Sequence, residues 1–280
     1  MVALSGVGFG VLSILVKTAY ALGAEAFTIL GLRFLLATAM IWLIAVRFDR
    51  QALRMDPRDI AYIGIIGPLG VGVGSMLYFS SLTLVDASLY VALFYTYPAV
   101  VNLASALIFR EPLSARQIVA LIVTFAGVVL VTGLASQGVV NASPLGIALS
   151  LATSAAYAVY TLGMQRQLRR HPPLAINAYL LAFGTLSVLI VRPPTQWTGT
   201  LDWPVLGVIA LMAVFCTIGP IILYLTGIRR IGAGAASIVS NMEPITTIAL
   251  AVLLLGETLD PLQIAGAAGV LGGVLLLETG

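Results

Sequence analysis

Residues 87–109 read ASLYVALFYTYPAVVNLASALIF, and this stretch decides the fold of the chain. Its 23 residues carry no charge, and a helix of that length can cross the roughly 30 Å hydrocarbon core of a membrane. Pro98 stands near the middle, where a proline removes a backbone hydrogen bond and clashes with the preceding turn. The stretch therefore predicts a membrane-spanning helix that is interrupted halfway.

The rest of the chain has the same apolar character. Hydrophobic residues make up 60% of it and charged residues 9%, and the mean hydropathy is +1.07. Soluble domains carry about 25% charged residues, so this chain has too few charges to cover a soluble surface. The net charge of +3 comes from scattered basic residues that form no stripe, which argues against nucleic-acid binding. We predict an all-α integral membrane protein in a lipid bilayer.

The apolar blocks are separated by short groups of charged residues, prolines and glycines, and they predict ten transmembrane helices. The predicted spans cover residues 2–20, 27–46, 60–83, 87–109, 116–134, 144–165, 174–191, 203–227, 233–255 and 261–278. No loop between them is long enough to hold a soluble domain. We expect one membrane unit that is a monomer or a weak homo-oligomer.

The loops differ in charge when they are assigned alternately to the two sides of the membrane. One side receives only Lys17 and Arg192. The other side receives Arg47, Arg50, Arg54, Arg58, Arg110, Arg116, Arg166, Arg169, Arg170, Arg229 and Arg230. Because Lys and Arg collect in cytoplasmic loops, this asymmetry predicts that both termini are cytoplasmic. We expect a multi-pass protein of a bacterial-type inner (plasma) membrane.

The two halves of the chain match each other at a shift of 146 positions. The matches are Leu77-Tyr78 with Leu223-Tyr224, Pro98 with Pro244, Glu111 with Glu257, Leu113 with Leu259, Gln117-Ile118 with Gln263-Ile264 and Gly127-Val128 with Gly273-Val274. Such self-similarity indicates an internal repeat, with units at residues 1–135 and 144–280. Each unit holds five predicted spans, and five is odd, so the second unit enters the membrane from the opposite face. The sequence predicts two inverted five-helix repeats.

Each repeat ends in a helix with a central proline, a Glu-x-Leu turn and a glycine-rich last helix. These residues are Tyr97-Pro98, Arg110-Glu111-Pro112-Leu113 and Gly127-Val128, then Glu243-Pro244, Gly256-Glu257-Thr258-Leu259 and Gly273-Val274. In this pattern the chain resembles the EamA family of the drug/metabolite transporter superfamily. The resemblance implies a metabolite exporter without a cofactor, in a family that includes exporters of aromatic amino acids.

The substrate is predicted from what the resemblance implies, together with the tyrosine-rich spans. They favour small amphipathic metabolites, first of all aromatic and other neutral amino acids. The first repeat departs from the family pattern, with Tyr97 where the second has Glu243 and Arg110 where it has Gly256. A drug, nucleoside or sugar-phosphate carrier on the same scaffold is therefore the alternative. Because the chain has no ATP-binding motif, we expect a secondary transporter that works by alternating access.

The prolines of the two repeats are the strongest sequence pointer to the substrate site. Inverted-repeat transporters bind their substrates near the midplane, beside interrupted helices. Pro98 and Pro244 are such a pair, and either they interrupt their helices as hinges or they kink them for packing.

Polar stripes run along the same two spans. Tyr95 and Asn102 lie seven residues apart in one span, and Ser237 and Asn241 lie four apart in the other, so each pair shares a helix face. We predict that these stripes line the substrate cavity. The alternative is that they bind neighbouring helices together.

Aromatic residues in the middle of spans complete the predicted cavity, because the aromatic belt would place them at the membrane interfaces. They are Tyr78, Phe94, Tyr157, Tyr160 and Tyr224. Tyr78 and Tyr224 are equivalent positions of the two repeats, and their rings suit an aromatic or amphipathic ligand.

Glu243 is the carboxylate that lies clearly inside a span, and an ionisable group there is a functional candidate by default. It could couple transport to protons or recognise an amino group. Counted as a continuous helix from Asn241, it points toward a neighbouring helix and would lock the structure instead. Arg33 and Lys17 are its possible partners, or they snorkel to an interface.

Other ionisable residues receive structural roles. Glu111 and Glu257 are expected to cap the helices that follow them. We interpret His171 as a solvated loop residue and Cys216 as a small buried hydrophobe. With one cysteine and one histidine in the chain, neither a metal site nor an intramembrane enzyme is predicted.

Overall fold

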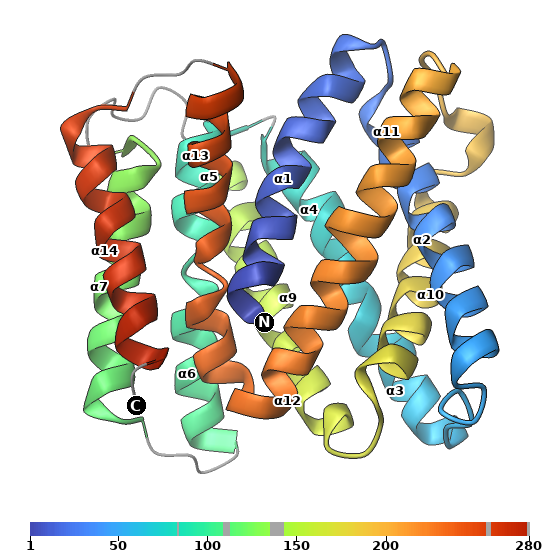
Figure 1. Cartoon of the computed structure of the whole chain (residues 1–280), viewed down its shortest axis with the longest axis horizontal. Coiled ribbons are helices and arrows are strands. Elements are labelled where there is room, and N and C mark those ends of the chain that lie inside the picture. Colours follow the sequence, from blue (N-terminus) through green and yellow to red (C-terminus); the bar gives the residue numbers. More distant parts are fainter. Residues whose placement is uncertain (83, 109–112, 135–142, 256–258, 279–280) are drawn as a thin grey trace.

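A computed structural model of the chain describes residues 1–82, 84–108, 113–134, 143–255 and 259–278 (Figure 1). These residues form helices and no named strand, with one isolated bridge between Ala24 and Gly199. Seven of the described helices are long and apolar enough to cross a membrane, and three more are apolar but shorter. The predicted all-α membrane fold is confirmed.

The first half of the chain contains eight described elements. They are α1 (Val2–Ala21), α2 (Ala26–Phe48), α3 (Pro57–Pro68), the π-helix η1 (Leu69–Val73), α4 (Gly74–Leu82), α5 (Ala87–Phe94), α6 (Tyr97–Ile108) and α7 (Ala115–Val131). Helix α3, η1 and α4 follow one another without a gap, so they form one long rod with a π-helical centre.

The second half repeats this order. It contains α9 (Pro144–Leu168), α10 (Pro173–Val191), the short 3-10 helix η2 (Pro194–Gln196), α11 (Trp203–Ala213), the π-helix η3 (Val214–Ile218), α12 (Gly219–Val239), α13 (Met242–Leu255) and α14 (Pro261–Glu278). Gly232 has φ 78° and ψ 164°, which breaks α12 into two parts. A positive φ of this kind suits glycine because it has no Cβ. The chain turns back between α12 and α13 (Figure 1).

Contacts between the helices follow the same plan in both halves. Helix α1 packs against α12 and α13, and α9 packs correspondingly against α4 and α6. Helix α2 packs on α10 at one end of the molecule, while α7 packs on α14 at the other end (Figure 1). The cavity described below lies between these two outer pairs.

Helix α1 touches α13 through its glycines. A Cβ on Gly6 would lie 2.9 Å from the Glu243 nitrogen, and a Cβ on Gly10 would lie 2.9 Å from the Glu243 carbonyl oxygen. No side chain fits in this space, so the two backbones lie in direct contact, as small residues permit in membrane bundles. The backbone of Glu243 is thereby held against α1 at both its nitrogen and its carbonyl oxygen.

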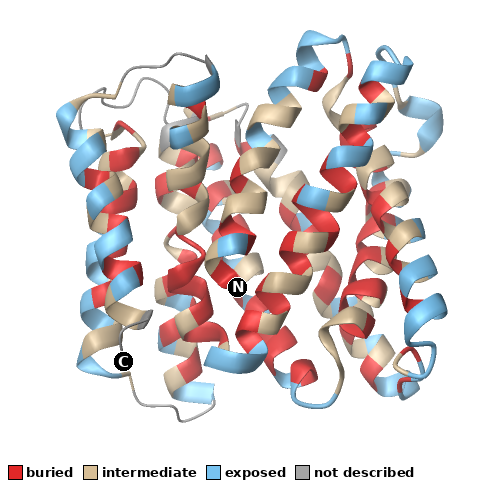
Figure 2. Cartoon of the chain, in the orientation of Figure 1, coloured by how far each residue is buried: buried red, intermediate tan, exposed pale blue. Residues whose placement is uncertain are grey.

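The outer surface of the bundle is apolar. Exposed residues lie mainly on the outward faces of the helices (Figure 2), and they include Leu107 at 82% exposure, Leu253 at 76% and Leu43 at 72%. Such large exposed apolar surface is not stable in water, and it suits a lipid environment.

One end of the bundle is held by a charged cluster around Asp59. The Asp59 carboxylate is 2.7 Å from His171 Nε2, 3.4 Å from Gln167 Nε2 and 3.6 Å from an Arg170 guanidinium nitrogen. Its basic surroundings predicted that His171 is a solvated loop residue. This prediction is wrong, because His171 contacts the Asp59 carboxylate. It joins the loop after α9 to the first turn of α3.

Replacing Asp59 by alanine should lower the free energy of unfolding by about 1 kcal/mol, because the buried partners on the α9 side lose their acceptor. Asp56 is the matched control, since it is exposed and its side chain caps no helix. Thermal unfolding of both variants in detergent measures the difference. Equal melting temperatures for the two variants would contradict a structural role for the cluster.

The helices α7 and α14 begin with equivalent caps. Ser114 Oγ accepts from the Gln117 N–H at 3.1 Å while Gln117 Oε1 accepts from the Ser114 N–H at 2.9 Å. Asp260 and Gln263 form the same reciprocal pair at 2.8 and 3.1 Å. These capping boxes satisfy the first backbone N–H groups of both helices. Residues 111 and 257, which carry the glutamates predicted to cap them, lie outside the described residues.

Candidate functional site

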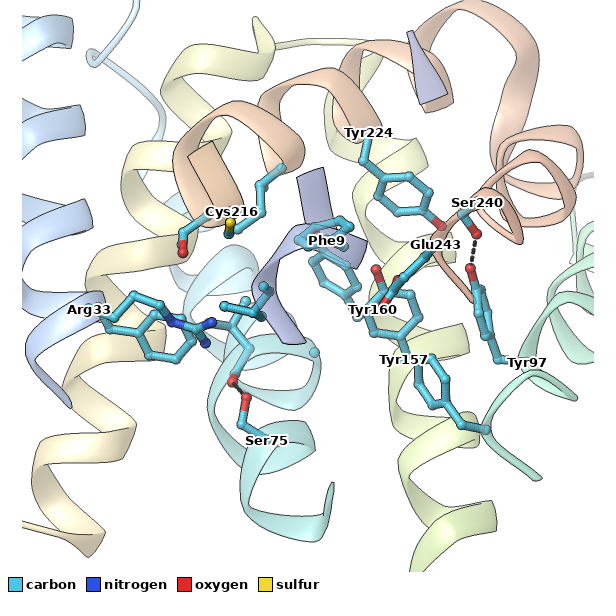
Figure 3. Close-up of a pocket in the computed structure, with 17 residues that line it drawn as sticks. Phe9, Arg33, Ser75, Tyr97, Tyr157, Tyr160, Cys216, Tyr224, Ser240 and Glu243 are labelled. Carbon is cyan, nitrogen blue, oxygen red and sulfur yellow. Dashed lines mark hydrogen bonds between the residues drawn. The ribbon is translucent and has the colours of Figure 1, made fainter. Parts of the chain in front are cut away.

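A cavity with an empty volume of about 830 Å³ lies between elements of the two halves (Figure 3). Its walls come from α1, α2, η1, α4, α5 and α6 of the first half and from α9, η3, α12 and α13 of the second. This space includes open solvent, and its walls combine aromatic rings with a few polar groups, as sites for small organic ligands do. The cavity therefore is the candidate functional site.

Two interrupted helices meet at the cavity. Residues 95–96 separate α5 from α6, and residues 240–241 separate α12 from α13. Pro98 and Pro244 follow these breaks in the first turn of the next helix, where the missing N–H leaves no hydrogen bond unmade. The prolines thus start the second half-helices and do not kink continuous ones.

Two π-helical turns form a second pair of irregularities in the cavity wall. The N–H of Gly74 donates to the carbonyl of Leu69, and the N–H of Gly219 donates to the carbonyl of Val214. A Cβ on Gly74 would lie only 2.7 Å from the Leu69 oxygen, so glycine makes this turn possible. Short π-helical insertions are frequent at functional sites, and here each contributes lining residues to the cavity.

Tyr157 lies at the centre of an aromatic wall. Its ring centroid is 4.8 Å from that of Tyr97, 5.4 Å from Tyr160, 5.5 Å from Phe94 and 6.3 Å from Tyr224. These separations are typical of favourable aromatic pairs. The wall offers ring faces and edges to a ligand from four helices, α5, α6, α9 and α12.

Hydrogen bonds hold two of these rings in place. The hydroxyls of Tyr97 and Ser240 are hydrogen-bonded across the two helix breaks (Figure 3). The hydroxyl of Tyr224 lies 3.3 Å from Thr161 Oγ1. Since a buried tyrosine hydroxyl needs a partner, these bonds orient the aromatic wall, and the bond between Tyr97 and Ser240 also connects the two halves.

Glu243 carries the carboxylate of the cavity. It stands in the first turn of α13, where free backbone N–H groups favour a negative charge. Its carboxyl lies beside the Tyr95 hydroxyl and interacts electrostatically with the hydroxyls of Tyr97 and Tyr157. Among the described residues no cation forms an ion pair with it. Glu243 therefore faces the cavity and not a neighbouring helix.

Arg33 carries a positive charge on the opposite wall. It comes from α2, and its guanidinium lies 4.8 Å from the ring centroid of Phe34. Figure 3 shows Arg33 and Glu243 on opposite sides of the cavity, with Phe9 between them. The expectation that Arg33 snorkels to an interface or pairs with Glu243 is wrong, because Arg33 lines the cavity and forms no ion pair with a described residue.

The cavity collects part of the predicted site. Phe94, Tyr157, Tyr160, Tyr224 and Glu243 all line it. They come from different predicted spans and include the carboxylate that the sequence singled out. The structure thus brings the mid-span aromatic residues of both halves to one place.

Other predicted residues lie behind this lining. The Tyr78 ring packs on Tyr90 at a centroid distance of 4.8 Å, and the Tyr95 ring packs on Phe94 at 5.3 Å. Tyr95 is buried and reaches the site through its hydroxyl beside Glu243. These tyrosines support the lining residues from outside the cavity.

The polar stripe of Asn102 and Ser237 lies at a helix contact and does not reach the cavity. Asn102 Nδ2 donates to the Gly234 carbonyl at 3.2 Å and to Ser237 Oγ at 3.4 Å. These bonds join α6 to α12, which is the helix-binding alternative of the sequence analysis. Asn241 is buried in the break before α13 and is not among the lining residues.

Several lining residues were not predicted from the sequence, namely Phe9, Leu12, Phe34, Gly70, Val71, Ser75, Tyr97, Cys216, Thr217, Ile221 and Ser240. One signal could have identified Tyr97, because it is equivalent to Glu243 at the shift of 146. Cys216 is buried as predicted, but it lies in a π-helical turn of the cavity wall. The remaining residues are ordinary apolar or small residues, and nothing in their sequence distinguishes them from other residues of the predicted spans.

Replacing Gly70 by alanine should lower the free energy of unfolding by about 1–3 kcal/mol, as overpacking does. A Cβ there would lie 2.7 Å from Tyr160 Cδ1 and 2.9 Å from Tyr160 Cβ, so the ring must leave its place in the aromatic wall. Gly207 is the control, because a Cβ on it meets nothing within 4 Å. Thermal unfolding of both variants tests this, and equal stability would mean that the ring relocates freely.

Comparison with known proteins identifies a matching family and several similar proteins. The model of the EamA-like transporter family matches residues 1–133 and 144–279. The chain is 31% identical over 269 residues to the "uncharacterized transporter YcbK" of Bacillus subtilis (strain 168), covering 92% of this chain and 85% of the relative. It is 29% identical over 217 residues to the "threonine/homoserine exporter RhtA" of Escherichia coli (strain K12), covering 72% of this chain and 66% of that exporter.

The fold also resembles a solved structure. A protein crystal structure superposes on the chain with a TM-score of 0.82 at 20% identity, covering 99% of this chain and 95% of the other. At this identity the likeness concerns the fold alone.

Proposed function

The chain belongs to the EamA-like transporter family, and from this premise we propose that it exports small amphipathic metabolites as a secondary transporter. Aromatic and other neutral amino acids are the proposed substrates. One observation carries the proposal: two broken helices from the two halves meet at a cavity lined by aromatic rings, one carboxylate and one guanidinium.

The proposed architecture has ten spans in two inverted five-helix repeats, with both termini cytoplasmic. The rod of α3, η1 and α4 is one span, and so is the rod of α11, η3 and the first part of α12. The matching helix contacts, capping boxes and π-helical turns of the two halves support this repeat. We place the protein in a bacterial-type inner membrane as a monomer or weak homo-oligomer.

Alternating access in this architecture would move the two halves around the cavity. Half-helices that end in the middle of the membrane can tilt relative to each other, because regular helical hydrogen bonding gives way at the breaks to turn bonds of Thr96 and Ser240. The π-helical turns add a second flexible point in each half. The cavity would then open first to one side and then to the other.

The chemistry of the cavity supports an amino acid as substrate. Aromatic rings bind an apolar side chain and attract a cation through their faces. Glu243 can accept an ammonium group, and Arg33 can donate to a carboxylate. The relative from Escherichia coli, which is described as an exporter of threonine and homoserine, is consistent with a substrate of this class.

The alternative is a drug, nucleoside or sugar-phosphate carrier. Arg33 in the cavity is the observation that favours a phosphorylated substrate, because guanidinium groups bind phosphate well. A doubly charged phosphate would then have to enter a cavity that also contains a carboxylate. This repulsion is the reason why we place amino acids first.

Transport into proteoliposomes tests the proposal. The panel contains labelled phenylalanine, tryptophan, threonine and alanine, together with a nucleoside, glucose 6-phosphate and a cationic drug. Phe94→Ala removes a ring from the cavity wall, and Phe215→Ala is its matched control because Phe215 is 62% exposed.

Saturable amino acid transport that falls in Phe94→Ala and persists in Phe215→Ala is the expected result. Transport of another member of the panel, without any amino acid, would show that the proposed substrate is wrong. Equal rates in the two variants would show that the substrate does not pass this cavity.

A further inference from the structure

We propose that Arg33 binds the carboxylate of a zwitterionic substrate whose ammonium group pairs with Glu243. Arg33 then is the residue that selects amino acids over simple amines. This inference rests on the proposed function, since it describes how the same cavity would hold an amino acid. It assigns a role to a residue that the sequence analysis left either as a partner of Glu243 or at a membrane interface.

The first observation is that Arg33 lacks a counter-charge among the described residues. Its Nε is buried without a hydrogen-bond acceptor among the described residues, and none of their carboxylates forms an ion pair with it. A buried charge without a counter-charge is strongly unfavourable, both in protein and within a membrane. The position therefore calls for an anion that the described residues do not supply.

Two hydroxyl groups of the cavity wall do not supply that anion. Ser75 Oγ donates to the Val71 carbonyl at 2.6 Å, and Thr217 Oγ1 donates to the Met212 carbonyl at 3.0 Å. Both hydroxyls line the cavity, but their protons point to the backbone. Arg33 is therefore the strong donor on this wall, and a planar guanidinium can hold both oxygens of a carboxylate.

The second observation is the opposite charge across the cavity. Glu243 lies among tyrosine rings, and a carboxylate surrounded by aromatic faces is a good site for an ammonium group. Arg33 lines the opposite wall of the same cavity. The cavity thus has a positive charge on one wall and a negative charge on the opposite wall. A zwitterion, which carries both charges and is neutral overall, can pair with both.

The two walls also explain why a closing motion is needed. In an α-amino acid the ammonium and the carboxylate sit on one carbon, whereas Arg33 and Glu243 lie on opposite sides of the cavity (Figure 3). Both contacts form together only when the cavity narrows around the substrate. The long side chain of Arg33 and the broken helix at Glu243 allow that approach. A substrate with one of the two groups would leave one wall uncompensated.

Three ligands separate the two contacts. L-phenylalanine carries both groups, phenethylamine lacks the carboxylate, and 3-phenylpropionate lacks the ammonium. Their dissociation constants are measured from the rise in melting temperature of the purified full chain with ligand concentration, so transport is not required. The variants are Arg33→Gln and Arg33→Lys, and Arg192→Gln is the matched control. Arg192 is exposed and stacks on Phe27 at 4.5 Å, outside the cavity.

The expected result is a loss of discrimination. In Arg33→Gln the Kd of phenylalanine should rise roughly 10- to 100-fold, the range of a lost charge-assisted hydrogen bond, while that of phenethylamine stays unchanged. Arg33→Lys should keep a preference for phenylalanine, and Arg192→Gln should behave as wild type.

Two outcomes would overturn the inference while leaving the proposed function intact. One is wild-type protein that transports phenylalanine but binds phenethylamine equally well. The other is an Arg33→Gln variant that still prefers phenylalanine as strongly as wild type does. If no amino acid binds or crosses the membrane with wild-type protein, the proposed function itself fails.

Discussion

Glutamine in place of Glu243 should reduce amino acid transport by roughly 100-fold, the upper range expected when a charge-assisted hydrogen bond to the substrate is lost. The substitution keeps the size of the side chain, and the backbone of this residue is held against Gly6 and Gly10 of α1. The fold should therefore persist while the ammonium group of the substrate loses its counter-charge. Initial rates in proteoliposomes, normalised to folded protein, measure the effect.

Two further measurements separate the possible roles of this carboxylate. Glu243→Asp retains the charge and should retain part of the activity. Counterflow, in which labelled substrate exchanges with unlabelled substrate without any ion gradient, should be lost in Glu243→Gln together with net transport. If counterflow persists and only gradient-driven transport is lost, Glu243 carries protons and does not bind the substrate. Wild-type rates in both assays would show that Glu243 is structural.

A pair of glycines on α14 should respond to alanine in opposite directions. A Cβ on Gly266 would lie 2.5 Å from the Val131 nitrogen and 2.7 Å from the Gly127 carbonyl oxygen, whereas a Cβ on Gly272 meets nothing within 4 Å. The atoms near Gly266 belong to the backbone of α7 and cannot rotate away. Gly266→Ala must push the two helices apart, which should lower the free energy of unfolding by about 3 kcal/mol or more.

Gly272→Ala should raise the free energy of unfolding by as much as about 1 kcal/mol, because alanine favours the helix over glycine. Both substitutions add the same methyl group to the same helix, so their difference reports the packing of α7 on α14 alone. Thermal unfolding in one detergent gives both values. A destabilisation of similar size in the two variants would mean that the α7–α14 contact in the membrane is looser than in this structure.

The fold could be predicted from the sequence because the hydrocarbon core of a membrane restricts the backbone. Every backbone polar group must be satisfied inside the segment that crosses the membrane, so long apolar blocks have to be helices. Pro98 and Pro244 also predicted that the helices of residues 87–109 and 233–255 are interrupted. The breaks lie just before the prolines, since a proline is tolerated in the first turn of a helix but not in its interior.

The candidate site was harder to predict because helical phase does not continue through a break. Counting from Asn241 turned Glu243 toward a neighbouring helix, but α13 begins anew at Met242. The same error affected Asn102, which was counted from Tyr95 across the break between α5 and α6. Mid-span tyrosines were a better guide, because they depend on depth in the membrane and not on phase.

Arg33 and the π-helical turns could not be read from the sequence for different reasons. A long arginine side chain in a span can either reach an interface or turn inward, and its neighbours in the sequence do not distinguish the two. The π-helical turns depend on one backbone hydrogen bond pattern in each half. Their sequences, LGVGV and VFCTI, have only valine in common.

Each π-helical turn sets the rotation of everything that follows it. Such a turn holds about one residue more than an α-helical turn, so a single-residue deletion within 69–73 would restore an α-helix and rotate α4 by about 100°. Ser75 would then leave the cavity wall although no side chain had been substituted. Two relatives whose rods differ only by this one residue can therefore present different side chains to a ligand. The ligand preference of such proteins is encoded in chain length as well as in chemistry.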